Sequence, residues 1–166
     1  EEENKSYMDR PPRGKDESLF AGGGLNCTCF YGALIALISM VAFLQLPVGI
    51  LLRAGNQITP AAIRTLLVDT ELLNRCQTYA FTVLGMSQLF HAMNCRNDKV
   101  SMFSIGLFKN KWLILTIVVG LALQVFVCHF PPMNLLLKTM PLALKEWLIV
   151  FGLSASTMVI NEVSKL

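Results

Sequence analysis

The chain has 166 residues, of which 54% are hydrophobic and only 15% are charged. Soluble domains carry roughly 25% charged residues, and here the charges crowd between long uncharged stretches. The formal net charge is only +3, and no basic cluster marks a nucleic-acid partner. Uncharged runs of about 18 residues or more can cross hydrocarbon. The sequence therefore predicts an integral, multi-pass membrane protein whose partner is the lipid bilayer.

The first 26 residues are polar and begin without an initiator Met or a signal-peptide layout, so we expect the chain to be part of a longer polypeptide. Pro47 lies near the far end of the first uncharged run and predicts a kink or a late break there. Four such runs predict four transmembrane helices, at about residues 27–52, 76–95, 112–130 and 142–160.

The connections between the spans carry their own signals. Thr59 followed by Pro60 is typical of a helix start and predicts an amphipathic surface helix over about residues 60–74. Pro131 and Pro132 end the third span, and a loop is expected from there to residue 141. Lys145 and Glu146 fall in the first turn of the fourth span, where we expect their charged ends to reach the interface.

An even number of spans places both ends of the chain on one side of the membrane. The N-terminal, middle and C-terminal polar segments hold nine Lys and Arg residues, against five in the two other connections. By the positive-inside rule the termini are cytoplasmic. The predicted fold is an all-α, polytopic, four-transmembrane-helix bundle, with residues 1–26 as a cytoplasmic loop segment and residues 27–166 as the membrane domain.

Small residues inside the spans favour packing roles. Gly85 and Gly120 are expected to permit close helix contact. The cysteine count is odd, and the Cys27-Thr28-Cys29 spacing is not that of a zinc or thioredoxin motif. We interpret all five cysteines as plain thiols that pack as small apolar residues.

The second span is the most polar of the four. Gln88, His91 and Asn94 are three residues apart, so they drift slowly around one helix face, and Ser87 borders that face. One interpretation is that these groups line an ion path. The other is that they hydrogen-bond neighbouring helices, as Asn, Gln and Ser often do in bundles. For His91 a proton relay competes with a structural or interfacial role, whereas His129 is interpreted as structural.

No nucleophile–base pair, metal-ligand cluster or nucleotide loop is visible in this sequence, so we expect no catalysis and no cofactor for the segment alone. Several motifs nevertheless resemble, in order along the chain, those of type II P-type cation-transporting ATPases, calcium pumps above all. They are Met8-Asp9-Arg10-Pro11-Pro12-Arg13, Gln88-Leu89-Phe90-His91-Ala92-Met93-Asn94-Cys95-Arg96, Gly106-Leu107-Phe108-Lys109-Asn110-Lys111-Trp112 and Glu146-Trp147-Leu148.

The resemblance implies that the four spans are helices 7 to 10 of such a pump, which would lie in a bacterial plasma membrane. The phosphorylated Asp, the nucleotide domain and helices 1–6 are not in this segment. The parent would use ATP and Mg²⁺ to export a cation, most simply Ca²⁺, and its other domains and helices would be the partners. This segment would be scaffold and coupling element, without ATPase activity of its own.

Two sites follow from the resemblance alone. Gln88 stands where two-site calcium pumps have a Glu ligand, and a neutral amide is the weaker partner for a hard cation. It is therefore a metal-site candidate in a pump that moves one calcium ion per cycle. The loop residues Arg10, Pro11, Pro12 and Arg13 would couple the membrane domain to the phosphorylation domain. The alternative function is a stand-alone four-span carrier or membrane scaffold protein.

Overall fold

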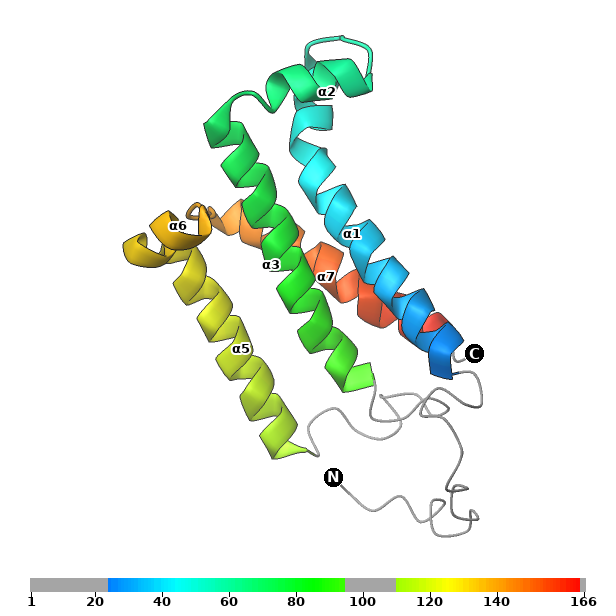
Figure 1. Cartoon of the computed structure of the whole chain (residues 1–166). Coiled ribbons are helices and arrows are strands. Elements are labelled where there is room, and N and C mark those ends of the chain that lie inside the picture. The colour runs from blue at the N-terminus through cyan, green and yellow to red at the C-terminus, as the bar shows by residue number, and fades with distance from the viewer. Residues whose placement is uncertain (1–23, 95–109, 165–166) are drawn as a thin grey trace.

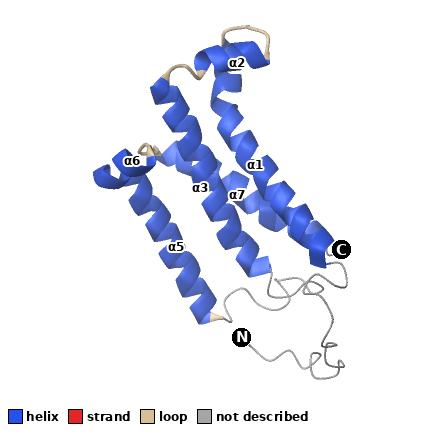
Figure 2. Cartoon of the chain, viewed as in Figure 1, coloured by secondary structure: helices blue, strands red, loops and turns tan. Residues whose placement is uncertain are grey.

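The computed structural model describes residues 24–94 and 110–164, and within these ranges all regular secondary structure is helical (Figure 2). This confirms the all-α class. The motif residues Arg10, Pro11, Pro12 and Arg13 lie outside the described residues. The helices are α1 (Gly24–Arg53), α2 (Pro60–Leu66), α3 (Thr70–Asn94), α5 (Lys111–His129), α6 (Pro131–Leu137) and α7 (Leu144–Ser164).

Helix α1 continues through Pro47 to Arg53, so the late break that the proline suggested does not occur. The chain then turns away from the helix axis at Gly55, two residues after Arg53, where φ is +68°. The N–H groups of Gly55 and Asn56 donate to the carbonyls of Leu52 and Leu51 at 3.2 and 3.0 Å. This pair of bonds is a Schellman motif, which needs a left-handed residue and so favours glycine.

The surface helix that the sequence predicts over residues 60–74 is wrong in its extent. The Thr59 hydroxyl caps α2 by accepting from the Ala62 N–H at 3.2 Å, but α2 ends at Leu66. The chain then turns, and Asp69 accepts from the Glu71 N–H at 3.0 Å. This second cap starts a new helix at Thr70, because a side-chain acceptor there satisfies an N–H that the helix leaves unpaired.

The loop predicted after Pro131 is also wrong, because residues 131–137 form α6. Proline is well tolerated in the first turn of a helix, where its missing N–H would have had no intrahelical partner. The two prolines therefore end α5 and begin α6. Lys138, with φ 54°, closes α6 in the left-handed region.

Helix α3 is the centre of the bundle and packs against α1, α5 and α7, and α1 also touches α7. In Figure 1, α5 and α1 flank α3 while α7 crosses behind it. The start of α1, the end of α3, the start of α5 and the end of α7 lie at one end of the bundle, and α2 and α6 lie at the other (Figure 1). The four long helices, α1, α3, α5 and α7, thus run in alternating directions along the bundle.

The core gathers where these four helices meet. Its buried apolar side chains come from α1, α3, the segment before α7, and α7 itself: Ile38, Ala42, Tyr79, Val83, Met86, Phe90, Leu142 and Val150. Half of the members belong to α3, which supplies more of this core than any other helix. Outside the core, large apolar side chains stay exposed on α1, α5 and α7, as expected where lipid replaces water as the solvent.

The predicted close contact at the two glycines is confirmed. A Cβ atom added to Gly85 would come within 2.9 Å of the Gln124 Oε1 atom of α5. A Cβ atom added to Gly120 of α5 would meet the Leu89 methyl groups of α3, also at 2.9 Å. Each glycine thus receives a side chain of the opposite helix, which brings the two backbones together.

The predicted number of spans needs one correction. Three of the described helices, α1, α5 and α7, are long and apolar enough to cross a membrane. Helix α3 has 25 residues, about 37 Å at 1.5 Å per residue, and so exceeds the roughly 30 Å of hydrocarbon. Its composition is too polar for it to qualify, but several of its polar side chains, among them Thr78, Thr82 and Ser87, are buried within the bundle.

Glu146 has a partner within the chain that the sequence did not indicate. Its carboxylate pairs with Arg75 of α3 at 3.2 Å, and only 15% of the Glu146 side chain is exposed. The other carboxylate oxygen accepts from the Ala143 N–H at 2.7 Å, which caps α7. One carboxylate therefore starts α7 and also fastens it to the beginning of α3.

We expect Glu146→Gln to lower the free energy of unfolding by about 1–2 kcal/mol, because it removes the charge that faces Arg75 but keeps an acceptor for Ala143. Titration with denaturing detergent in mixed micelles, followed by circular dichroism, measures the change. Glu71→Gln is the matched control: Glu71 is exposed in the first turn of α3 and should cost at most about 0.5 kcal/mol. Equal losses in the two variants would contradict the role of the pair.

Candidate functional site

Three faces of α3 are covered and the fourth is open. The exposed residues of this helix between its charged start and its end are Gln77, Phe81, Leu84, Gln88 and Ala92. Their spacing of three and four residues places them on one face. We call these five residues the open stripe. Because α1, α5 and α7 occupy the other sides, the open stripe lies between α1 and α5 (Figure 1).

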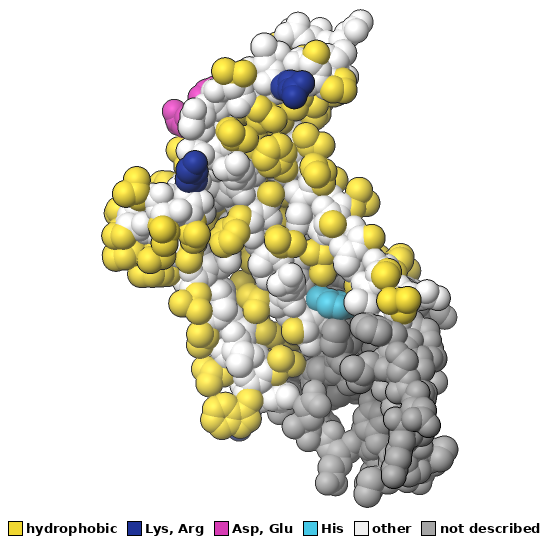
Figure 3. Space-filling model, viewed as in Figure 1, with side chains coloured by type: hydrophobic (Ala, Val, Ile, Leu, Met, Phe, Trp, Pro, Cys, Tyr) yellow, Lys and Arg dark blue, Asp and Glu magenta, His cyan; other side chains and the backbone are white. Residues whose placement is uncertain are grey.

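Gln88 is part of this open stripe. It therefore points away from the packed interior, and the described residues do not enclose it. The view from this side, in Figure 3, shows a mainly hydrophobic surface whose Lys, Arg, Asp and Glu side chains gather at the upper end of the described part. The Gln88 amide on such a face is available to whatever covers α3 there.

The sequence groups Ser87 and Asn94 with Gln88, but the structure separates them. Ser87 is fully buried and Asn94 is 1% exposed. The Ser87 Oγ atom has no hydrogen-bond partner among the described residues. These two side chains therefore belong to the interior of the bundle, whereas Gln88 belongs to its surface.

His91 turns toward α1, where its ring lies 4.7 Å from the ring of Tyr31. The Tyr31 hydroxyl donates a hydrogen bond to the Oδ1 atom of Asn161 on α7. Tyr31, His91 and Asn161 thus join α1, α3 and α7 at the end of the bundle where α3 stops. This geometry fits the structural interpretation of His91. His129 stacks on Trp147 at 6.2 Å, which fits its structural interpretation too.

The sequence did not predict the other hydrogen bonds between helices. Its only indication was the presence of small polar residues within apolar runs. The Ser154 hydroxyl of α7 lies 2.8 Å from the Val150 carbonyl and 3.4 Å from the Val83 carbonyl of α3. Thr78 accepts from the Met140 N–H at 2.9 Å, before α7 begins. Such contacts add polar cohesion between helices where the hydrophobic effect gives little.

A cation site enclosed by this part of the chain alone has no support. The described residues contain no group of three His, Cys, Asp or Glu side chains that could hold a metal ion. Hard cations prefer several oxygen ligands, carboxylates among them. What the arrangement offers is two outward amides, Gln77 and Gln88, on an otherwise apolar stripe, and Gln88 is the one at the position that the motif comparison singles out.

The family is settled by the sequence as a whole. A family model described as "Cation transporting ATPase, C-terminus" matches residues 1–166. The chain belongs to this ATPase family. The match confirms the resemblance drawn from the motifs, and it leaves the stand-alone carrier without an observation in its favour.

Individual relatives agree with the family. The chain is 34% identical to "Calcium-transporting ATPase 1" of Bacillus cereus over 165 residues, which are 99% of this chain and 18% of that protein. It is 34% identical to the "Calcium-transporting ATPase" of Bacillus subtilis over 52% of this chain and 10% of that protein. "Calcium-transporting ATPase type 2C member 2" of Rattus norvegicus is 33% identical over 55% of this chain and 10% of that protein. The chain spans less than a fifth of the length of these relatives.

We expect Tyr31→Phe to destabilise the bundle by about 1 kcal/mol, because the ring still packs on His91 while the donor to Asn161 is lost. The same detergent titration measures it. Ser39→Ala is the control, since the Ser39 hydroxyl bonds only to the Ile35 carbonyl of its own helix, at 2.8 Å, among the contacts described. A Tyr31→Phe protein as stable as the wild type would show that this bond between α1 and α7 contributes nothing.

Proposed function

We propose that the chain is the C-terminal membrane domain of an ATP-driven pump that exports Ca²⁺. The observation that carries this proposal is the match over the whole chain, to the family model and to a relative named a calcium-transporting ATPase. The parent protein would hydrolyse ATP with Mg²⁺ through a phosphorylated aspartate. In this proposal the chain itself hydrolyses nothing and serves as scaffold and coupling element.

The open stripe supports the scaffold role. A polar helix in a membrane is stable when its polar groups face other helices or a cavity. The covered faces of α3 meet that condition within the chain, whereas Gln77 and Gln88 on the open stripe do not. The remaining helices of the parent pump are the natural cover for this stripe, and they are the partners that the proposal requires.

In this proposal α3 crosses the membrane with α1, α5 and α7, and residues 27–166 form one four-span domain behind a cytoplasmic segment of residues 1–26. The alternating direction of the helices supports this topology (Figure 1). The excess of Lys and Arg supports cytoplasmic ends for this domain, and the bacterial relatives support a bacterial plasma membrane.

This topology predicts which positions a membrane-impermeant maleimide reaches in intact cells. In a variant with its native cysteines replaced by serine, Asn56→Cys between α1 and α2 should react from outside. Lys111→Cys, at the start of α5, should react only after the membrane is opened. The reverse pattern would overturn the proposed orientation.

Gln88 is the proposed ion contact of this domain. Its exposed amide on the open stripe would supply one oxygen ligand, and helices of the rest of the pump would supply the others. A single neutral ligand is weaker than a carboxylate, which supports one calcium ion per cycle rather than two. His91, Ser87 and Asn94 then hold α3 in place rather than touch the ion.

In the full-length pump, Gln88→Ala should raise the Ca²⁺ concentration for half-maximal ATPase activity by about tenfold, the smallest effect expected when a partner of a metal site is lost. Gln88→Glu should retain or tighten calcium binding. Gln77→Ala is the matched control, because it removes the same amide from the same stripe three turns away. If Gln88→Ala and Gln77→Ala both leave the calcium dependence unchanged, Gln88 is structural. The same ATPase assay with Mn²⁺ or Co²⁺ in place of Ca²⁺ tests which ion the pump transports.

The segment Arg10-Pro11-Pro12-Arg13 is the proposed coupling element, and the same assay separates its role from ion binding. Replacing both arginines by alanine should lower the maximal rate of calcium-stimulated ATP hydrolysis while the half-maximal calcium concentration stays the same. A shift in calcium affinity at an unchanged maximal rate would contradict a coupling role for this segment.

A further inference from the structure

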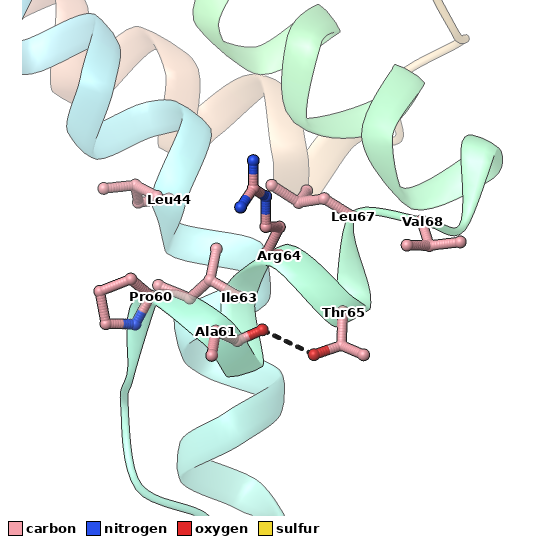
Figure 4. Close-up of a pocket in the computed structure, with 8 residues that line it drawn as sticks. All are labelled: Leu44, Pro60, Ala61, Ile63, Arg64, Thr65, Leu67 and Val68. Atoms are coloured by element: carbon pink, nitrogen blue, oxygen red, sulfur yellow. Dashed lines mark hydrogen bonds between the residues drawn. The ribbon is translucent and has the colours of Figure 1, made fainter.

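An open groove of about 820 Å³ lies between α1 and α2, at the end of the bundle where α2 folds back beside α1. Its wall is apolar on both sides, with Leu44 on α1 and Ile63, Leu67 and Val68 in and after α2. Figure 4 shows Leu44 and Leu67 on opposite sides of the groove. The volume falls within the roughly 300–1,000 Å³ of small-molecule pockets.

Arg64 is the one charged residue that lines this groove, and its side chain extends between Leu44 and Leu67 (Figure 4). The other polar lining group, the Thr65 hydroxyl, is already engaged with the Ala61 carbonyl at 2.6 Å. The nearest acidic residue along the chain, Asp69, caps α3 instead. None of the ion pairs found among the described residues includes Arg64. The groove therefore combines an apolar wall with a cation that has no counter-ion within residues 24–94 and 110–164.

The location of the groove narrows the choice of ligand. Helix α1 is long and apolar enough to cross a membrane, and Arg53, its last residue, directly precedes the turn to α2. The groove therefore lies where the hydrocarbon gives way to head groups. An amphiphile with an anionic head and an apolar chain would complement both the Arg64 side chain and the apolar wall of the groove. A guanidinium binds phosphate oxygens through two parallel hydrogen bonds.

We propose that the groove between α1 and α2 binds one anionic phospholipid. Its phosphate pairs with the Arg64 guanidinium, and an acyl chain lies against Leu44 and Ile63. This site is independent of the ion contact proposed at Gln88, which lies on the open stripe of α3 and does not line the groove. The bound lipid fills the space beneath α2 and holds this short helix against α1.

The test compares lipid retention by the full-length protein that contains this chain. Native mass spectrometry after release from vesicles of phosphatidylglycerol and phosphatidylcholine, mixed in varied ratios, measures the affinity for each lipid. We expect Arg64→Gln to weaken phosphatidylglycerol binding by about fivefold, the effect of one basic residue at a membrane surface. Arg64→Lys should retain most of the binding. Inorganic phosphate at millimolar concentration should not displace the lipid, because it lacks the acyl chain.

Arg53→Gln is the matched control, since Arg53 is exposed at the same end of the bundle but does not line the groove. It should leave phosphatidylglycerol binding unchanged. Equal binding by Arg64→Gln and wild-type protein would overturn the site, and so would an equal loss in Arg53→Gln, which would indicate only diffuse surface charge. A photo-crosslinker at Leu67 should capture lipid, and capture of another protein segment or of a second copy would show that the groove is a protein contact instead.

Discussion

The polarity of α3 is the constraint on which the rest of the structure depends. This helix carries threonine, serine, glutamine and asparagine side chains through the middle of an apolar protein, and such groups are costly where no partner or cavity receives them. Three neighbouring helices therefore surround it. The glycine contacts bring α5 close, the Arg75–Glu146 pair fastens the start of α7, and Tyr31 spans from α1 past His91 to Asn161. Each device acts at a different face or end of α3.

Only the open stripe of α3 escapes this enclosure. In a soluble protein it would be an ordinary wet surface, but in lipid an amide such as Gln88 needs a partner. The open stripe is therefore the feature of the fold that the proposed assembly with other helices would cover. A domain that surrounds its most polar helix on three sides is suited to be one wall of a larger assembly, and its family and its fraction of the relatives' length agree with that role.

The sequence was sufficient for the all-helical membrane class and for three of the four predicted spans, because run lengths of uncharged residues determine where helices can cross a bilayer. It also predicted the close contacts at Gly85 and Gly120, where the missing side chain lets a neighbouring helix approach. It failed at residues 60–74 and 131–137, where short helices are decided by local caps. Asp69 and Pro131 can each end one element or begin another, and composition does not distinguish these outcomes.

The candidate site was only half visible in the sequence. The three-residue spacing of Gln88, His91 and Asn94 predicts a shared face, but each step of three turns the helix by about 300°. This drift is enough to place Gln88 on the open stripe and Asn94 inside the core. The pairing of Glu146 with Arg75 was not visible either, because the partners are 71 residues apart in the chain. Contacts of that range follow from how helices pack rather than from any local pattern.

The weak apolarity of α3 also bears on how the protein is made. Membrane insertion selects segments by hydrophobicity as they emerge from the ribosome, and α3 lacks enough of it to qualify alone. Helix α1 is synthesised first, is strongly apolar and packs along α3. Packing against α1 offsets part of the cost of placing the polar side chains of α3 in lipid. Helices α1, α2 and α3 thus have the form of one hairpin with the short helix α2 in its turn, an arrangement suited to insertion as a single unit.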